Sequence, residues 1–375
     1  MKVVTLVGTR PELIKLSCVI AELEKRLDHV LVHSGQNYDY ELNEVFFNQL
    51  GLPEPHHFLG MAAETAAEAV AKAIAAFDKV LRTERPDAML ILGDTNSCMA
   101  AYAAKRLKIP IFHMEAGNRC FDQRVPEEIN RALIDHMSDI NMPYTEHARS
   151  YLLREGISPE TVIKTGSPMR EVLERFAADI EASGVLAETG LEPGGYFVLS
   201  CHREENVDDE KNLERLFECV RRLDAEYALP VVFSVHPRTR VRLEALGGKL
   251  PDSVLQHKPF GFFEYIRLQK NAYCVLSDSG TLTEESALLD FPAVMLRQAH
   301  ERPEGMDVGS VVMADLDPET LLTAVRVVTS QREPGRERQF QVPADYRADD
   351  VSRKVVRTII SYTGYVNRTV WKRFD

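Results

Sequence analysis

The chain has 375 residues, of which 45% are hydrophobic and 27% are charged, as in a soluble globular protein long enough for two domains. A formal net charge of -12 argues against broad binding to nucleic acid or to anionic membranes, because such binding needs a basic surface. The start of the chain does not resemble a signal peptide, no apolar run approaches membrane-spanning length, and the six cysteines lack disulfide or zinc spacing, so we expect a cytoplasmic protein with reduced thiols and no metal.

Short apolar runs alternate with helical patterns through the first half of the chain. The predicted strands are Val3–Val7, Val30–His33, Ala88–Leu92 and Ile111–Phe112. The predicted helices start at Pro11 and Pro126 or span Tyr40–Leu50, Thr65–Arg82 and Asn96–Leu107. Because the strands are almost wholly apolar, we expect a parallel sheet covered by helices on both faces. This pattern predicts one Rossmann-like domain.

The alternation pauses after Gly166 and restarts at Tyr196–Ser200, which predicts a second Rossmann-like domain. Its further predicted elements are Glu210–Glu226, Val231–Ser234, Val254–Gln256, Phe262–Asn271, Cys274–Ser277, Thr283–Leu289 and Ala293–Leu296. We therefore divide the chain into domains 1–167 and 168–360 and a C-terminal tail, 361–375, that packs back on the first domain.

Opposite charges meet at the end of a buried strand in the segment His113–Arg131, HMEAGNRCFDQRVPEEINR. Glu115, Glu127 and Glu128 supply carboxylates, and Arg119, Arg124 and Arg131 supply guanidinium groups. Glutamates in a first helical turn also suit the helix dipole, so a solvated helix start would explain Glu127 and Glu128 without a function. It would not explain a carboxylate and a glycine turn directly after the strand, where open α/β sheets place ligands.

Two further loops of the first domain follow predicted strands. Gly8–Glu12 opens a helix, a position where backbone N–H groups attract phosphate, and Arg10 and Lys15 can add charge there, although Arg10 can instead pair with Glu12. In the second loop, GDTNS, Asp94 is either a helix N-cap or a free functional carboxylate. The chain has no GxGxxG pattern, so we expect no dinucleotide cofactor.

Loops of the second domain carry the complementary chemistry. His202 and Arg203 follow one strand and His236 follows the next, which suits phosphate binding and acid–base work. Ser279 and Gly280 open a helix with small residues that let backbone amides approach a phosphate, and a carboxylate in its first turn can bind ribose hydroxyls. These loops predict an interdomain cleft that holds an anionic nucleotide sugar.

Seven motifs, in this order and at these distances, resemble the non-hydrolysing UDP-N-acetylglucosamine 2-epimerase family over nearly the whole chain. They are GTRPE (8–12), GDTNS (93–97), HMEAGNR (113–119), PEEINR (126–131), HREEN (202–206), SDSGTLTEE (277–285) and ERPE (301–304). Four segments resemble the branch that converts UDP-2-acetamido-2,6-dideoxy-L-talose to UDP-N-acetyl-L-fucosamine for bacterial capsule and O-antigen synthesis: 35–47, 117–131, 258–265 and 366–371.

The resemblance implies a GT-B-like α/β fold in which two Rossmann-like domains with parallel sheets face a cleft, and it implies a homodimer. It assigns catalysis to Asp94, Glu115, Glu127 and His202. It assigns contacts to the UDP-linked acetamido sugar to Arg10, Lys15, Arg131, Tyr265, Ser279, Gly280, Glu285 and Arg302, with Glu285 on the ribose and Phe260 a rival to Tyr265 at the uracil. The loops after the strands add Arg203 and His236 to these contacts. AGNR replaces the AGLR of the N-acetylglucosamine enzymes, and Asn37 replaces a histidine of relatives that their own substrate regulates.

Inverting C2 of an acetamido sugar is difficult, because no adjacent ketone makes the C2 hydrogen acidic. Elimination of UDP to a bound 2-acetamido-glycal, followed by its return with protonation on the opposite face, solves this with two acid–base groups and cations around the diphosphate. We therefore expect an isomerase without a cofactor. The alternatives are an epimerase that forms UDP-N-acetylmannosamine from UDP-N-acetylglucosamine, a GT-B glycosyltransferase and a non-catalytic sensor of nucleotide sugars.

Overall fold

A computed structural model describes the chain except for residues 36–39, 62, 64, 247–249, 333–335 and 375, so that Asn37 lies outside the described residues. The chain forms two compact units. The first combines Met1–Arg175 with Ala344–Asp375, and the second is Phe176–Pro343. The sequence-based ranges place residues 168–175 and 344–360 in the second domain, whereas their contacts in the structure group them with the first unit.

The first unit is built on a six-stranded parallel sheet with the order β3-β2-β1-β4-β5-β6. Its strands are β1 (Lys2–Val7), β2 (Asp28–His33), β3 (His57–Phe58), β4 (Ala88–Leu92), β5 (Ile111–Met114) and β6 (Ile140–Met142). Every residue of β4 and β5 is buried, as the apolar runs predict. The short edge strands β3 and β6 were not predicted, because two or three residues give no readable period.

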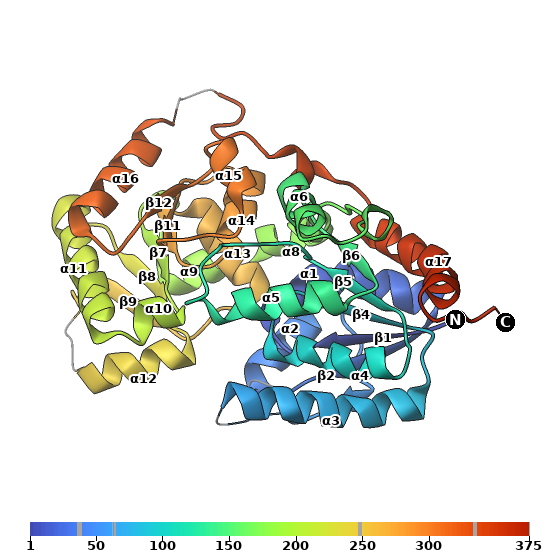
Figure 1. The fold of residues 1–375 in the computed structure, drawn as a ribbon. Helices are drawn as coiled ribbons and strands as arrows, with labels where there is room; N and C mark the ends of the chain where they lie inside the picture. The colour runs from blue at the N-terminus through green and yellow to red at the C-terminus, as the bar shows by residue number, and fades with distance from the viewer. Residues whose placement is uncertain (36–39, 62, 64, 247–249, 333–335, 375) are drawn as a thin grey trace. The chain divides into compact units, whose positions relative to one another are not determined.

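Helices flank this sheet (Figure 1). They are α1 (Arg10–Arg26), α2 (Tyr40–Leu50), α3 (Ala66–Glu84), α4 (Ala101–Arg106), α5 (Pro126–Met137), α6 (Glu146–Arg154), α7 (Met169–Arg175) and α17 (Val351–Thr369), with short 3-10 turns η1 (Asn96–Ala100), η2 (Pro159–Thr161) and η3 (Ala344–Arg347). The predicted helix Asn96–Leu107 is therefore divided into η1 and α4. Helix α3 buries Ala73, Phe77 and Val80 against the core, which explains its amphipathic pattern.

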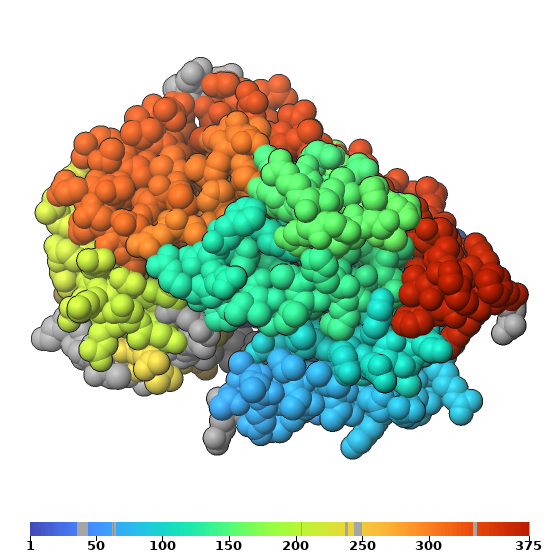
Figure 2. Space-filling view, in the orientation of Figure 1, coloured from blue at the N-terminus to red at the C-terminus, as the bar shows by residue number. Residues whose placement is uncertain are grey.

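The last helix of the chain, α17, packs on α1. Val355, Ile359 and Val366 are buried at helical spacing. Beyond the helix, the Lys105 ammonium lies 5.4 Å from the centre of the Trp371 ring, a cation–π contact. Figure 2 shows this C-terminal segment, in red, lying against the green and cyan parts of the same unit. The end of the chain therefore helps to cover the unit in which the chain begins.

The second unit contains another six-stranded parallel sheet, with the order β12-β11-β10-β7-β8-β9. Its strands are β7 (Phe197–Ser200), β8 (Val231–Ser234), β9 (Val254–His257), β10 (Cys274–Ser277), β11 (Ala293–Leu296) and β12 (Val312–Ala314). Its helices are α8 (Ala177–Ala182), α9 (Val185–Thr189), α10 (Glu204–Val207), α11 (Glu210–Tyr227), α12 (Pro237–Leu246), α13 (Phe262–Asn271), α14 (Leu282–Leu289), α15 (Pro303–Asp307) and α16 (Pro318–Ser330). Two parallel sheets with flanking helices confirm the predicted α/β class and both Rossmann-like units.

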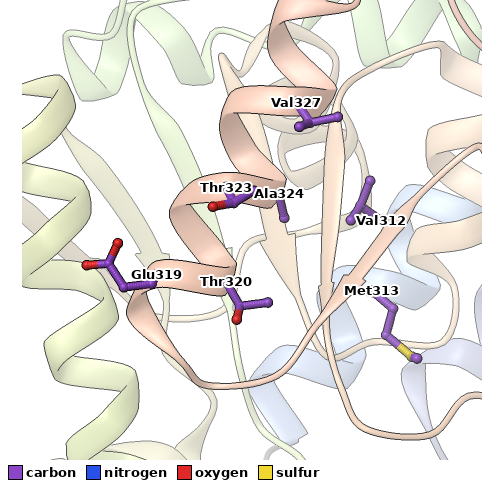
Figure 3. Close-up of a pocket in the computed structure, with 7 residues that line it drawn as sticks. All are labelled: Val312, Met313, Glu319, Thr320, Thr323, Ala324 and Val327. Carbon is purple, nitrogen blue, oxygen red and sulfur yellow. The ribbon is translucent and has the colours of Figure 1, made fainter.

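An open groove of about 430 Å³ runs between the edge strand β12 and helix α16 (Figure 3). Its lining residues are Val312, Met313, Glu319, Thr320, Thr323, Ala324 and Val327. None of them is a predicted site residue. Among the described helices, none is long and apolar enough to cross a membrane.

The packing of α17 predicts unequal effects of truncating two adjacent isoleucines. Ile359 is fully buried, whereas Ile360 is 51% exposed. Ile359→Ala should lower the free energy of unfolding by roughly 2–5 kcal/mol, because it removes buried methyl groups and leaves a cavity. Ile360→Ala should change it by less than about 0.5 kcal/mol. Urea unfolding of both variants measures this difference, and equal losses would contradict the packing of α17.

Candidate active site

Three carboxylates of the first unit, of which Asp94 and Glu115 are predicted site residues, follow three neighbouring strands of one parallel sheet. Glu12 comes after β1, Asp94 after β4 and Glu115 after β5, and β1, β4 and β5 are adjacent in the sheet. Parallel strands end at the same edge of a sheet, so the loops that carry these groups lie together. This edge carries the candidate site residues of the first unit.

Asp94 forms an ion pair with an arginine of α5. Arg131 Nε donates to Asp94 Oδ2 at 2.5 Å, and Asn130 Nδ2 donates to the Asp94 carbonyl oxygen at 2.9 Å. The capping position of η1 is occupied by Thr95 rather than Asp94. Asp94 is therefore not the cap of η1 and is held by Arg131, and its role in catalysis stays a prediction.

Glu115 is held by two groups and stands in a constrained backbone. Lys15 Nζ lies 2.6 Å from Glu115 Oε2, and both side chains are largely buried. Asn118 Nδ2 donates to the other carboxylate oxygen at 3.4 Å. The φ angle of Glu115 is +62°, in the left-handed region that residues other than glycine rarely adopt. Such strain is maintained only when neighbouring contacts enforce it, and it is common at functional sites.

Asp135 enforces the turn after Glu115, and sequence reasoning missed it. The two oxygens of this fully buried carboxylate both accept the N–H of Gly117, at 3.2 and 3.1 Å. The carboxylate also lies 2.7 Å from Arg119 Nη1 and 3.0 Å from His113 Nδ1. The turn needs glycine at Gly117, where φ is +80° and a Cβ atom would sit 2.4 Å from the Ala148 carbonyl oxygen. The signal was present in the sequence, because residues 128, 131 and 135 have the spacing of one helix face.

The two adjacent glutamates of α5 have different surroundings. Glu128 is buried and accepts hydrogen bonds from the backbone N–H groups of Cys120 at 3.1 Å and Phe121 at 2.9 Å, and from Arg131 Nη1 at 2.8 Å. It therefore ties the loop before α5 to the helix. Glu127 is half-buried in the first turn of the same helix. Its role in catalysis stays a prediction.

Two backbone N–H groups that were expected to bind phosphate donate instead to a carboxylate of the same chain. Gly8 N donates to Glu12 Oε2 at 2.5 Å and Thr9 N donates to the same oxygen at 3.0 Å. The expectation that these N–H groups bind an external anion is therefore wrong, because the Glu12 carboxylate takes that position at the start of α1. Arg10, the first residue of α1, lies with its guanidinium 5.9 Å from the centre of the Phe46 ring.

The candidates of the second unit also lie at the carboxyl ends of neighbouring strands. His202 and Arg203 follow β7, His236 follows β8, and Ser279 and Gly280 follow β10. The rings of His202 and His236 have centroids 5.7 Å apart. Arg302 begins α15, after β11. These groups therefore gather at one edge of the second sheet.

Asp278 fixes the loop that carries His202, and it was not assigned from the sequence. Its Oδ2 atom accepts from the backbone N–H groups of His202 and Arg203, both at 2.9 Å, and Oδ1 lies 3.1 Å from His202 Nδ1. Burial opposes ionisation of Asp278, but the charge of His202 and these hydrogen bonds outweigh burial and hold the pKa of Asp278 well below its usual range. The carboxylate is therefore positioned to orient the imidazole of His202.

Glu301 gathers three arginines near Gly280. Arg297 Nη1 lies 2.7 Å from Glu301 Oε2, and the guanidinium groups of Arg203 and Arg302 each lie 3.3 Å from Oε1. A Cβ atom on Gly280 would lie 2.6 Å from Arg302 Nη1 and 2.6 Å from Glu301 Oε1, so a side chain here would displace the ends of both side chains. Arg302 Nε also lies 3.1 Å from Glu284 Oε2, so the cluster joins three guanidinium groups to two buried carboxylates.

The predicted uracil contact, Tyr265, lies on α13, and the predicted ribose contact, Glu285, lies on α14. Gln269 Nε2 donates to Glu285 Oε2 at 2.7 Å, and Tyr265 lies one turn before Gln269. Burial, with the nearby charge of Glu285, raises the pKa of Tyr265. The ring of its rival, Phe260, lies 5.1 Å from that of His257. Ser279 Oγ lies 3.0 Å from the Thr281 hydroxyl.

Within the part of the chain that the structure describes, no group of three or more His, Cys, Asp or Glu side chains is arranged to hold a metal ion.

Burial raises the pKa of Glu12 to about 7, and the charge of Asp94 acts in the same direction, against the hydrogen bonds from Thr95, Gly8 and Thr9. Because the folded-state pKa exceeds the ordinary value of 4.5, the stability due to protonated Glu12 is complete below about pH 4.5 and is lost as the pH rises through about 7.

We expect Glu12→Gln to remove this pH dependence. Between about pH 5 and pH 8, the free energy of unfolding of the native protein should fall by roughly 2–3 kcal/mol relative to that of the variant. Denaturant titrations at both pH values measure the difference. Glu171→Gln, which changes a carboxylate bound to Ser352, is the control and should behave like the native protein. If the free energy of unfolding fell by the same amount in the native protein and in Glu12→Gln, the pH dependence could not be due to the raised pKa of Glu12.

Comparison with known proteins gives a consistent result. The family model described as UDP-N-acetylglucosamine 2-epimerase matches residues 21–360. A UDP-N-acetylglucosamine 2-epimerase from Methanocaldococcus jannaschii is 36% identical over 88% of this chain and 93% of its own length. A UDP-2,3-diacetamido-2,3-dideoxy-D-glucuronate 2-epimerase from Pseudomonas aeruginosa is 34% identical over 87% of this chain and 92% of its own length.

Solved structures agree with these relatives. A UDP-N-acetylglucosamine 2-epimerase from Rickettsia bellii is 50% identical, with a TM-score of 0.94 and full coverage of both chains. The Methanocaldococcus jannaschii enzyme, crystallised with UDP-GlcNAc and UDP, is 35% identical, with a TM-score of 0.89 and coverage of 96% of this chain and 100% of its own. The glycosyltransferase SnogD from Streptomyces nogalater, 13% identical with a TM-score of 0.50, covering 97% of this chain and 99% of its own, shares the GT-B-like fold alone. The chain is therefore an isomerase that belongs to the UDP-N-acetylglucosamine 2-epimerase family.

Proposed function

We propose that this protein inverts C2 of a UDP-linked 2-acetamido sugar, converting UDP-2-acetamido-2,6-dideoxy-L-talose to UDP-N-acetyl-L-fucosamine for capsule or O-antigen synthesis. Membership of the epimerase family supports the reaction class. The observation that carries the proposal is the pair of carboxylates at one sheet edge, Asp94 and Glu115, each held by a cation, at 2.5 and 2.6 Å. This pairing fixes the direction of each carboxylate at the edge where α/β sheets bind ligands.

The proposed reaction balances without oxidation or reduction. The C2–H bond breaks as a carboxylate takes the proton, the electron pair forms the C1–C2 double bond, and the C1–O bond breaks to release UDP. UDP oxygen then returns to C1 as an acid protonates C2 on the other face. Asp94, Glu115 and Glu127, with His202, are the proposed acid–base groups.

The departing diphosphate needs stabilisation by positive charge. Arg302 and Arg203, which Glu301 holds together, are proposed to bind it, with Arg10. Lys15 and Arg131 stay in the proposal as substrate contacts, but the structure pairs them with Glu115 and Asp94. Glu285 is proposed for the ribose and Tyr265 for the uracil. His236, Ser279 and Gly280 complete the set.

One feature of the loop before α5 supports the 6-deoxy substrate. The ring of Phe121 is 72% exposed, the residue has a φ of +57°, and Glu128 accepts its backbone N–H. Tyr151 packs edge-on against the ring with centroids 5.1 Å apart. A rigid, exposed aromatic ring suits contact with the methyl group of a 6-deoxy sugar. The names of the relatives instead favour UDP-N-acetylglucosamine, the second candidate substrate.

A homodimer is part of the proposal. Tyr102 on α4 and Ile129 and Leu133 on α5 are large apolar side chains with about half of their surface exposed. These two helices pack against each other, so the three residues belong to neighbouring parts of the surface. Exposed apolar surface of this kind is typical of protein contacts.

The reaction is tested by incubating the protein with each candidate UDP-sugar in heavy water, without an acceptor, and following both by NMR. We expect conversion of the 6-deoxy-talose substrate to its C2 epimer, with deuterium at C2 of the product. Conversion of UDP-N-acetylglucosamine alone would replace the proposed substrate with the second candidate. An epimer without deuterium at C2, or transfer of sugar only when an acceptor is added, would refute the mechanism.

Asp94→Asn tests the proposed proton transfer. The amide keeps the shape of the side chain and an acceptor for Arg131, but it cannot take a proton from C2, so kcat should fall by roughly 10²–10⁴. Asp87→Asn is a matched control, because Asp87 binds Lys2 N at 2.7 Å and is not a site candidate. It should retain native kcat. Near-native turnover of Asp94→Asn would show that Asp94 is not an acid–base group.

A further inference from the structure

Glu12 links two loops of the first unit. It is only 3% exposed, although it carries a carboxylate. One oxygen accepts the N–H groups of Gly8 and Thr9 in the loop after β1, and the other accepts the Thr95 hydroxyl, in the loop after β4, at 2.9 Å. Thr95 is the neighbour of Asp94 in the chain. Glu12 therefore connects the start of α1 to the loop that carries the proposed proton-transfer group.

The described hydrogen bonds of Glu12 come from neutral dipoles. Asp94 and Cys98 face it from the segment after β4, and the negative charge of Asp94 repels its own. On its own helix, Arg10 lies over Phe46 and Lys15 pairs with Glu115. Burying an ionisable group among such neighbours is costly compared with a neutral side chain. A residue chosen only to cap α1 would not need to be buried beside another carboxylate.

We propose that Glu12 is a positioning residue for the epimerisation: its ionised carboxylate holds the Thr95 hydroxyl and thereby sets the orientation of Asp94 toward the substrate. This inference rests on the proposed function and adds a residue that does not itself touch the sugar. It also gives a reason for the hydrogen bond from the Thr95 hydroxyl of the GDTNS loop to Glu12 on α1.

Protonation of Glu12 would reverse the direction of the hydrogen bond between Glu12 and Thr95. Two N–H groups point at Oε2, so an added proton must reside on Oε1, which then donates to the Thr95 oxygen instead of accepting from it. The Thr95 hydroxyl hydrogen has to turn away, and the Cys98 sulfur, 3.6 Å from the hydroxyl oxygen, is the described acceptor in reach. The link to Asp94 therefore depends on the charge state of Glu12, and kcat should fall as Glu12 takes up a proton.

The test compares kcat and KM of four variants with the native protein between about pH 6 and pH 8. Glu12→Gln places a fixed donor or a neutral oxygen opposite Thr95, and Thr95→Val removes the hydroxyl while leaving Glu12 intact. Both should lower kcat at about pH 8 by roughly 10–100-fold and flatten its rise with pH, with KM changing less than about twofold. Thr95→Ser, which keeps the hydroxyl, should restore native behaviour.

Glu171→Gln is the fourth variant and the control for replacing a partly buried carboxylate, since Glu171 binds Ser352 and should leave kcat and its pH profile unchanged. Circular dichroism establishes that each variant is folded, and Thr95→Val alone decides the question if Glu12→Gln does not fold. Native kcat and a native pH profile in folded Thr95→Val would overturn the proposed role of Glu12. Failure of the native protein to epimerise either sugar would overturn the proposed function instead.

Discussion

The common edge at which parallel strands end is the constraint on which both units depend. In each sheet the strands run in one direction, so the loops after neighbouring strands come together there. Loops from distant parts of the sequence, such as those of Asp94 and Glu115, are thereby placed side by side. The sheets supply rigid support, and the loops are left to carry the chemistry.

Ion pairs and hydrogen bonds then determine how the candidate functional groups point. Arg131 holds Asp94, Lys15 holds Glu115, and Asp278 holds the His202 loop through backbone N–H groups. Removing charged groups from water is costly, so such pairs are weak as sources of stability. Their value lies in orientation, because proton transfer and diphosphate binding both need side chains fixed before the substrate arrives.

The similarity to known proteins establishes the family of this chain, whereas the sugar on which it acts is a proposal. Similarity over most of the chain to UDP-N-acetylglucosamine 2-epimerases establishes the family and the kind of reaction. The same family includes relatives named for different acetamido sugars, so membership does not select the sugar. In this chain the features proposed to select it are in the loop before α5, where Glu128 holds the backbone of Phe121.

Local pattern determined the fold class and most of the elements, because burial repeats with the period of a strand or a helix, as in β4 and α3. It also identified the loops after the strands as the place for Asp94, Glu115 and His202. Only the tertiary structure showed that Glu12 takes the N–H groups of Gly8 and Thr9, and that Asp135, Asp278 and Glu301 hold the functional loops. These partners are distant in sequence, and the physical reason is that a buried polar group must find its hydrogen bonds wherever the order of the strands brings them.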